Sequence, residues 1–171
     1  MNDALAQERL QPSLFDRLID EEPDHALESD DKRTLTRAAL RQAVLRDLGW
    51  LLNATGHGLA FDDPRHPHAA RSVLNYGLPM LSGQFTSSIQ RVSMEQALKQ
   101  AIVQFEPRIL SQTLEVELVM EGPALESHNC VGLQIRGTLW AQPVPLEFLM
   151  RSRIDLGEGR IELESGSGGR G

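Results

Sequence analysis

The 171-residue sequence is short of several residue types, and each shortage excludes a class of protein. Cys130 is the only cysteine, so the chain can form neither an internal disulfide nor a thiolate metal cluster. No apolar run reaches the roughly 18 residues of a membrane-spanning helix. Residues 1–4 also lack the basic and apolar parts of a signal peptide. We therefore expect a cytoplasmic protein.

Positive charge is scarce as well. Lysine and arginine number 17 against 24 aspartates and glutamates, which gives a formal net charge of -7. Proteins that bind nucleic acids or anionic membranes rely on lysine and arginine to neutralise phosphates. The charge balance therefore favours protein partners, with no nucleic acid and no membrane insertion.

What the sequence does contain is typical of a soluble globular domain. Hydrophobic residues make up 40% and charged residues 24%, and a chain of this length can bury a real core. We predict a docking helix and acidic linker over residues 1–33 and a single α+β domain over residues 34–164. Residues 165–171, rich in glycine and serine, are expected to be a disordered tail.

Two long segments have the spacing of amphipathic helices. Residues 34–54 place leucines and a valine three and four positions apart, with Asp30 or Asp31 as the expected cap. In the second segment, residues 93–105, Ser93 and Gln96 have the spacing of a capping box. A short apolar helix is also expected within residues 12–20, and two helical turns within residues 69–74.

After Pro107 the hydrophobic period changes to two, which indicates strands. Strands are expected near residues 113–120, 131–139 and 144–151, with a short fourth at 161–163 and a possible bulge at Gly137. The predicted fold is α+β. Two main helices and a short N-terminal helix would cover one face of a small, mainly antiparallel sheet of three to four strands.

Two groups of residues could suggest chemistry. One is a histidine-rich loop that could suggest a metal: His57, His66 and His68, with Asp62 and Asp63. It lacks the geometry of a zinc site, so exposed histidines explain it better. A second group, Glu115 and Glu117, could serve a glycosidase, but acids are expected on the wet face of a strand. Phosphate loops and nucleophile elbows are absent, so we expect no enzyme, no cofactor and no metal.

The segment Glu106-Pro107-Arg108 stands at the junction of the second helix and the first strand. A rigid proline between an acid and an arginine fixes both side chains in one turn, where they would lose little entropy on docking to a partner. Local physics favours a simpler interpretation, an internal ion pair that caps the helix. Both interpretations stay open at this point.

Four segments in order carry a family resemblance. They are Pro12-Ser13-Leu14-Phe15-Asp16-Arg17-Leu18, Val44-Leu45-Arg46-Asp47-Leu48-Gly49-Trp50-Leu51-Leu52-Asn53, Arg71-Ser72-Val73-Leu74-Asn75-Tyr76-Gly77-Leu78-Pro79 and Phe105-Glu106-Pro107-Arg108. Together they look like the signature of the TssE family of type VI secretion baseplate subunits, over roughly residues 12–155. That family is similar to a wedge protein of contractile phage tails long labelled lysozyme-like.

The resemblance implies a structural baseplate subunit at the inner face of the cell envelope. It would join wedge proteins of the TssF, TssG and TssK types to sheath proteins of the TssB and TssC types, and help to start sheath assembly. Glu106, Pro107 and Arg108 would dock on wedge partners. The sheet would accept a partner strand at an open edge, for which residues 112–117 and 144–150 are candidates.

Two other functions follow from related proteins. A muramidase needs a carboxylic acid in an apolar pocket and a second carboxylate nearby. Glu106 beside Arg108 should stay ionised, which makes a poor general acid. A regulatory anti-adaptor of similar fold is the other alternative, and the intact Glu106–Arg108 motif with the segment 12–18 favours the baseplate role.

Overall fold

The computed structural model describes residues 10, 12–18, 35–58, 63–79, 88–119, 130–141, 144–155 and 157–163. The predicted linker, the C-terminal tail, Asp30, Asp31 and Asp62 lie outside these residues. The elements, in chain order, are α1 (Leu14–Leu18), α2 (Arg37–Asn53), α3 (Pro67–Ala70), η2 (Val73–Asn75), α4 (Ser88–Phe105), η3 (Ser111–Thr113), β1 (Glu115–Val119), β2 (Cys130–Leu139), β3 (Leu146–Asp155) and β4 (Arg160–Leu163).

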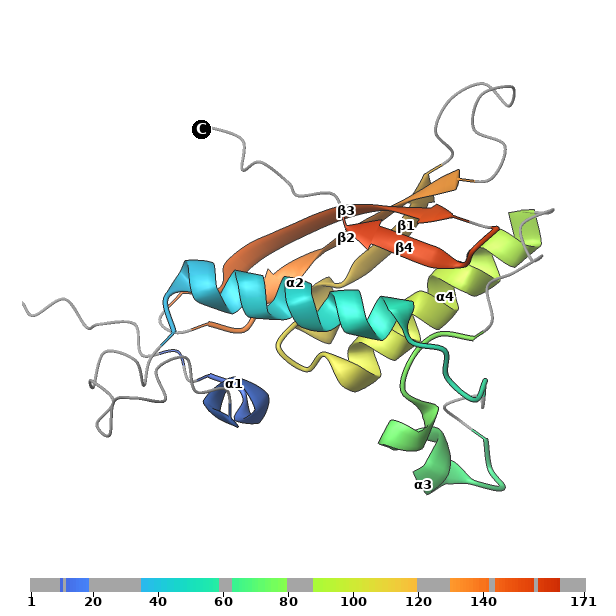
Figure 1. Ribbon diagram of the computed structural model, residues 1–171, viewed down its shortest axis with the longest axis horizontal. Helices are drawn as coiled ribbons and strands as arrows, with labels where there is room; N and C mark the ends of the chain where they lie inside the picture. The colour runs from blue at the N-terminus through green and yellow to red at the C-terminus, as the bar shows by residue number, and fades with distance from the viewer. Residues whose placement is uncertain are drawn as a thin grey trace, which may run out of the picture.

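The elements form layers. The sheet is one layer, α2 and α4 lie side by side against one of its faces, and α1 and α3 lie beyond these helices (Figure 1). Helix α4 lies against β1, while α2 lies against β3 and β4. The predicted α+β fold is confirmed, with the difference that α1 packs on α2 rather than on the sheet.

The sheet is a four-stranded antiparallel meander in the order β1-β2-β3-β4. Ten consecutive residue pairs join β2 to β3, from Cys130 opposite Asp155 to Leu139 opposite Leu146. The face away from the helices pairs opposite charges on neighbouring strands, such as Glu115 with Arg136 and Arg153 with Glu162. Because the strand order is β1-β2-β3-β4, strands β1 and β4 are the two edges of the sheet.

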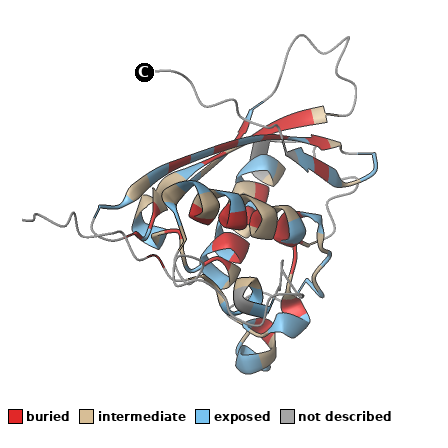
Figure 2. Cartoon of the chain, turned by 60° about the vertical axis from the view of Figure 1, so that its left-hand side comes forward, coloured by how far each residue is buried: buried red, intermediate tan, exposed pale blue. Residues whose placement is uncertain are grey.

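The core lies between the sheet and the two long helices (Figure 2). Helix α2 buries six residues: Leu40, Ala43, Val44, Leu48, Leu51 and Leu52. Helix α4 adds Met94, Leu98, Ala101 and Ile102. Alternate residues of the strands complete the core, among them Ile135, Phe148 and Ile154. Burial of this apolar surface supplies the main force that holds the helices on the sheet.

Both predicted helix starts are wrong. The cap of α2 is Thr36, whose hydroxyl accepts a hydrogen bond from the Ala39 N–H (3.1 Å). Helix α4 begins at Ser88, so Ser93 lies inside it rather than at its cap. The stretch before Ser93 contains no proline or glycine, so nothing in it stops the helix from extending five residues further back.

The predicted bulge at Gly137 is also wrong, because the β2–β3 register runs through it without interruption. Glycine fits this position for a different reason, which is steric. A Cβ atom at this position would lie 3.1 Å from the Ile109 Cγ2 atom, so the missing side chain leaves room for Ile109 against the sheet.

The long connection between α2 and α4 is fixed by its own contacts. Residues 69–74 do not form one helical segment; the chain breaks into α3 and η2, and the amide of Asn75 donates to the Ala70 carbonyl (3.0 Å). Gly77 has a φ of +116°, and Leu78 exchanges backbone hydrogen bonds with Ala54 and Gly56.

Among the described residues, no helix is long and apolar enough to cross a membrane.

Candidate docking site

The Glu106-Pro107-Arg108 segment forms the turn that follows α4. The Arg108 Nε atom donates to Glu106 Oε1 (2.6 Å), and Arg108 Nη2 donates to Glu106 Oε2, so the two side chains form a two-bond fork. The Arg108 N–H also donates to Glu106 Oε1 (3.2 Å). Glu106 is only 2% exposed, so its carboxylate lies inside the protein, directly after the C-terminal end of α4.

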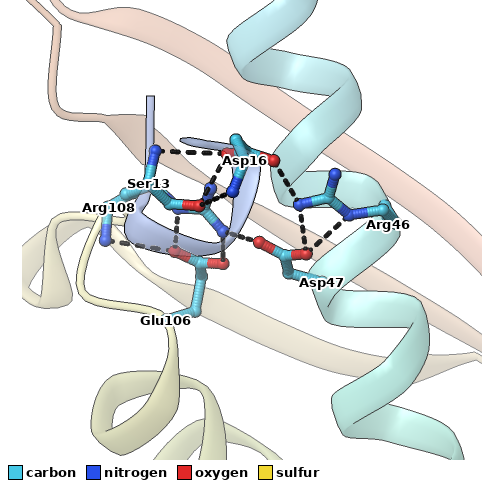
Figure 3. Close-up of polar contacts among 6 residues, drawn as sticks. All are labelled: Ser13, Asp16, Arg46, Asp47, Glu106 and Arg108. Carbon is cyan, nitrogen blue, oxygen red and sulfur yellow. Dashed lines mark hydrogen bonds and ion pairs between the residues drawn. The ribbon is translucent and has the colours of Figure 1, made fainter. Parts of the chain in front are cut away.

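The ion pair extends into a chain of charges across three elements, which we call the charged junction: Ser13, Asp16, Arg46, Asp47, Glu106 and Arg108 (Figure 3). Asp47 on α2 accepts hydrogen bonds from Arg108 Nη2 and from Arg46 Nε (2.8 Å). Arg46 in turn donates to Asp16 of α1 (2.7 Å). Acid and base alternate along the chain, so each charge has an opposite neighbour.

The ionisation of these groups follows from their partners. Burial opposes the charge of Arg108, but the hydrogen bonds and charges of Glu106 and Asp47 outweigh it and raise its pKa. Arg46 behaves in the same way, with Asp16 and Asp47 raising its pKa against burial. Burial also opposes the charge of Asp16, and hydrogen bonds from Ser13 and Arg46 nevertheless lower its pKa. Asp16, Arg46 and Arg108 therefore stay charged near neutral pH.

Ser13 and Asp16 fix the start of α1. The Ser13 hydroxyl donates to Asp16 Oδ2 (2.6 Å), and the Asp16 N–H donates back to that hydroxyl (3.3 Å). The ring of Phe15 meets Trp50 edge to face, with centroids 5.3 Å apart, and the Arg46 guanidinium lies 5.0 Å from the Trp50 ring. The Arg46 guanidinium also lies 5.4 Å from the Phe15 ring. The Asp16–Arg46 ion pair and these two contacts of Phe15 thus hold this five-residue helix on α2.

The connection between α2 and α4 reaches the same region. Tyr76 meets the Phe105 ring with centroids 5.2 Å apart, directly beside the Glu106 turn. Burial raises the Tyr76 pKa, and the charges of Asp47 and Glu106 add to this effect. The amide of Gln104 also donates to the Arg71 carbonyl (2.9 Å). Each of the four sequence segments that carry the resemblance therefore contributes to one region of the molecule.

The three predicted site residues differ in their access to a partner. The Glu106 carboxylate faces inward, Pro107 is exposed, and the Arg108 side chain is 21% exposed. The internal pair that local physics favoured is present, and Pro107 and the outer part of Arg108 are the surface of this turn. The sequence did not reveal Asp16, Arg46 and Asp47 as parts of the site, although all three lie inside the quoted segments.

The other candidate groups lie apart from the charged junction. His57, His66 and His68 are exposed, and in the described part of the chain no three histidine, cysteine or acidic residues gather to hold a metal. Glu115 and Glu117 project from the outer face of β1, where Arg136 and Gln134 stand opposite them.

The fold and the site define a class of small α+β subunit, with an antiparallel meander covered by two helices and an internally paired acid-proline-arginine turn. The family model described as baseplate wedge protein gp25 matches residues 38–144, which is more than half of the chain. The chain belongs to this baseplate family. No curated protein matches the sequence. The matched range ends between β2 and β3 and includes the Glu106 turn and all of α2 except its first residue.

Proposed function

We propose that this chain is a structural subunit of a type VI secretion baseplate, linking wedge proteins to the contractile sheath. The observation that carries the proposal is the family match over residues 38–144, which gives the chain a structural role in a baseplate. The four ordered segments favour the TssE type of subunit. The expected partners are wedge proteins of the TssF, TssG and TssK types and sheath proteins of the TssB and TssC types, at the inner face of the envelope.

We place the wedge contact at the Glu106 turn. Pro107 and the accessible part of Arg108 would touch the partner, while the buried Glu106 positions the guanidinium through its two hydrogen bonds. Asp47 accepts a further hydrogen bond from Arg108 Nη2, the nitrogen that also bonds to Glu106. Because these bonds fix Arg108 before a partner arrives, docking would cost little side-chain entropy.

The geometry also supports a non-enzymatic role. Both oxygens of Glu106 accept hydrogen bonds from Arg108, and the neighbouring carboxylates Asp16 and Asp47 are each paired with arginines. A general acid has to hold a proton that it can deliver to substrate, and a carboxylate engaged by an arginine fork is poorly suited to that. Purified protein should release no reducing ends from peptidoglycan.

Co-purification with recombinant wedge and sheath subunits tests the proposal. Wild-type protein should capture wedge subunits, Arg108→Ala should lose them, and Arg151→Ala should behave as wild type. Arg151 is a suitable control because it is exposed on the face of the sheet away from the helices. Circular dichroism has to show that Arg108→Ala is folded. Failure of the wild type to capture any wedge or sheath subunit would contradict the baseplate role.

A further inference from the structure

Two neighbouring apolar side chains of η2 stand in solvent. Val73 is 81% exposed and Leu74 is 65% exposed. Single apolar side chains are common on protein surfaces, but two neighbours at this exposure form a small apolar surface, which we call the apolar pair. The pair belongs to the segment that contains α3, and this segment lies on the far side of α4 from the sheet (Figure 1).

Hydrogen bonds fix the backbone that carries the apolar pair. The Ser72 hydroxyl donates to the Ala69 carbonyl (2.9 Å) and accepts from the Leu74 N–H (3.2 Å). The Tyr76 N–H donates to the Val73 carbonyl (3.1 Å). Because these bonds occupy the backbone groups of the turn, a partner has to recognise the apolar pair through its side chains.

Two side-chain amides anchor this turn to the rest of the fold. The amide of Asn75, which is only 3% exposed, donates to the Ala70 carbonyl (3.0 Å). From α4, the Gln104 amide donates to the Arg71 carbonyl (2.9 Å). A turn held in this way loses little conformational entropy when a partner covers it. Covering the apolar pair would then gain the free energy of removing its surface from water.

The charge near the apolar pair differs in sign from that of the whole chain. The chain has a formal net charge of -7, whereas its described residues 63–79 contain two arginines, Arg65 and Arg71, against one acid, Asp63. The Asp63 side chain is 13% exposed and lies 3.8 Å from Arg65. Arg71 and two histidines of this stretch are exposed. The accessible charge is therefore positive, and carboxylates of a partner complement it.

We infer that the apolar pair and Arg71 form a docking surface for an acidic amphipathic helix of a partner protein. A projecting apolar side chain fits the hole between residues i, i+3, i+4 and i+7 of a facing helix. Apolar residues at those positions would cover Val73 and Leu74, and acids beside them would bond to the Arg71 guanidinium. This surface is separate from Pro107 and Arg108 and specifies the chemistry of its partner, so it goes beyond the proposed function.

The surface has a fixed position relative to the Glu106 turn. Tyr76 directly follows η2, and its ring meets the Phe105 ring with centroids 5.2 Å apart. Phe105 is the last residue of α4 and precedes Glu106. A single partner bound both at Pro107 and at the apolar pair would therefore bind more tightly than through either contact alone.

A designed peptide tests the surface without any baseplate protein. The probe is a capped helix of leucine, alanine and glutamate with leucine at positions i, i+3, i+4 and i+7, and its twin has lysine in place of glutamate. In isothermal titration calorimetry the acidic peptide should bind at least about tenfold more tightly than the basic twin, and high salt should weaken its binding. Changes in amide chemical shift should centre on residues 71–76.

Variants of exposed side chains locate the binding. Val73→Ser/Leu74→Ser should weaken binding of the acidic peptide at least about tenfold, because the apolar contact is lost. The matched control is Leu14→Ser/Leu18→Ser on α1, where the two leucines are 75% and 74% exposed. This control should bind within about twofold of the wild type. Circular dichroism has to show that both variants are folded.

A charge reversal tests the same surface without touching the apolar pair. Arg71→Glu should weaken binding of the acidic peptide and strengthen binding of the basic twin, because it reverses the charge beside Val73 and Leu74. Absence of acidic-peptide binding to the wild type, equal binding of the two peptides, or equal losses in the two serine variants would overturn the inference. Unchanged peptide preference in Arg71→Glu would overturn it as well.

These results are separable from a failure of the proposed function. If the acidic peptide binds as expected but the wild type captures no wedge or sheath subunit, the baseplate role fails and the docking surface stands. If those subunits are captured and the peptide does not bind, the inference about the apolar pair alone fails.

Discussion

At the scale of single residues, the charged junction shows how the desolvation cost of a buried carboxylate is offset. Glu106 is almost fully buried, and removing a carboxylate from water costs several kcal/mol unless other groups replace the lost solvation. Arg108 supplies that replacement with its two-bond fork, and Asp47 adds a second negative charge at Arg108 Nη2. The pairing is therefore a condition of folding before it is a feature of docking.

Replacement of Arg108 should therefore reduce stability as well as partner binding. We expect Arg108→Ala to lower the free energy of unfolding by about 3 kcal/mol, because it leaves Glu106 buried without a counter-ion. Arg108→Lys keeps the charge but loses the fork, and should cost roughly 1 kcal/mol. Urea unfolding measures both. The double variant Glu106→Gln/Arg108→Met should recover much of the loss, and an Arg108→Ala protein as stable as wild type would refute this account.

At the scale of elements, the sequence predicted what depends on local pattern. The helical stripe from Leu40 to Leu52 and the alternation from Leu114 to Leu118 are confirmed, because burial imposes those periods on the chain. The start of α4 was missed, since a serine with a glutamine three residues later occurs inside helices as well as at their ends. The Asp47–Arg108 pair joins residues that are 61 positions apart in the sequence, and a local pattern cannot indicate a contact at that separation.

The glycine-rich connection provides a prediction about an element boundary. A Cβ atom at Gly77 would lie 2.4 Å from the Ala54 carbonyl oxygen, and its φ of +116° suits glycine alone. We expect Gly77→Ala to destabilise the fold by about 3 kcal/mol. Gly58 is the matched control, because it has a φ of +70° with nothing within 4 Å of its Cβ position. Gly58→Ala should cost about 1 kcal/mol, and equal losses in urea unfolding would contradict the steric explanation.

The docking of α1 should depend on pH through Asp16. Its pKa lies below the ordinary value of 3.8, so the charged form stabilises the folded state at higher pH. That stabilisation is complete above pH 3.8 and is lost as the pH falls through the lower folded value. In a Trp140→Phe background, Trp50 is the one remaining tryptophan of the chain and reports on its contact with Phe15.

The expected result is a change in Trp50 fluorescence below about pH 3.8 that precedes loss of the far-ultraviolet dichroism of α2 and α4. Asp16→Asn cannot take up this proton and should show the low-pH signal already at neutral pH. If Asp16→Asn gives the same pH curve as its parent, the contact between Asp16 and Arg46 does not hold α1 in place.

At the scale of the whole molecule, the helices perform two tasks. They bury one face of the sheet, and they project Asn53 and Glu95 around it to satisfy the backbone of the two edge strands. An open sheet in water invites pairing with any other exposed strand, so a subunit that has to await its partners needs such covers. A period-two pattern could predict strands but not their order. Of the two edge candidates, residues 112–117 reach the edge strand β1, whereas residues 144–150 lie mainly in the interior strand β3, so the second candidate was wrong. The side chains that cover the edges were not foreseeable from sequence.

The cover at β4 is expected to control self-association. Asn53→Ala removes both bonds to Ile161, so the Ile161 amide should exchange with solvent at least about tenfold faster than in wild type. The uncovered edges of two copies should then pair, giving a concentration-dependent dimer in sedimentation velocity. Gln42→Ala removes an exposed amide from the same helix and should change neither property. Wild-type exchange at Ile161 would show that Asn53 does not seal the edge, and fast exchange without association would show that the seal does not prevent pairing.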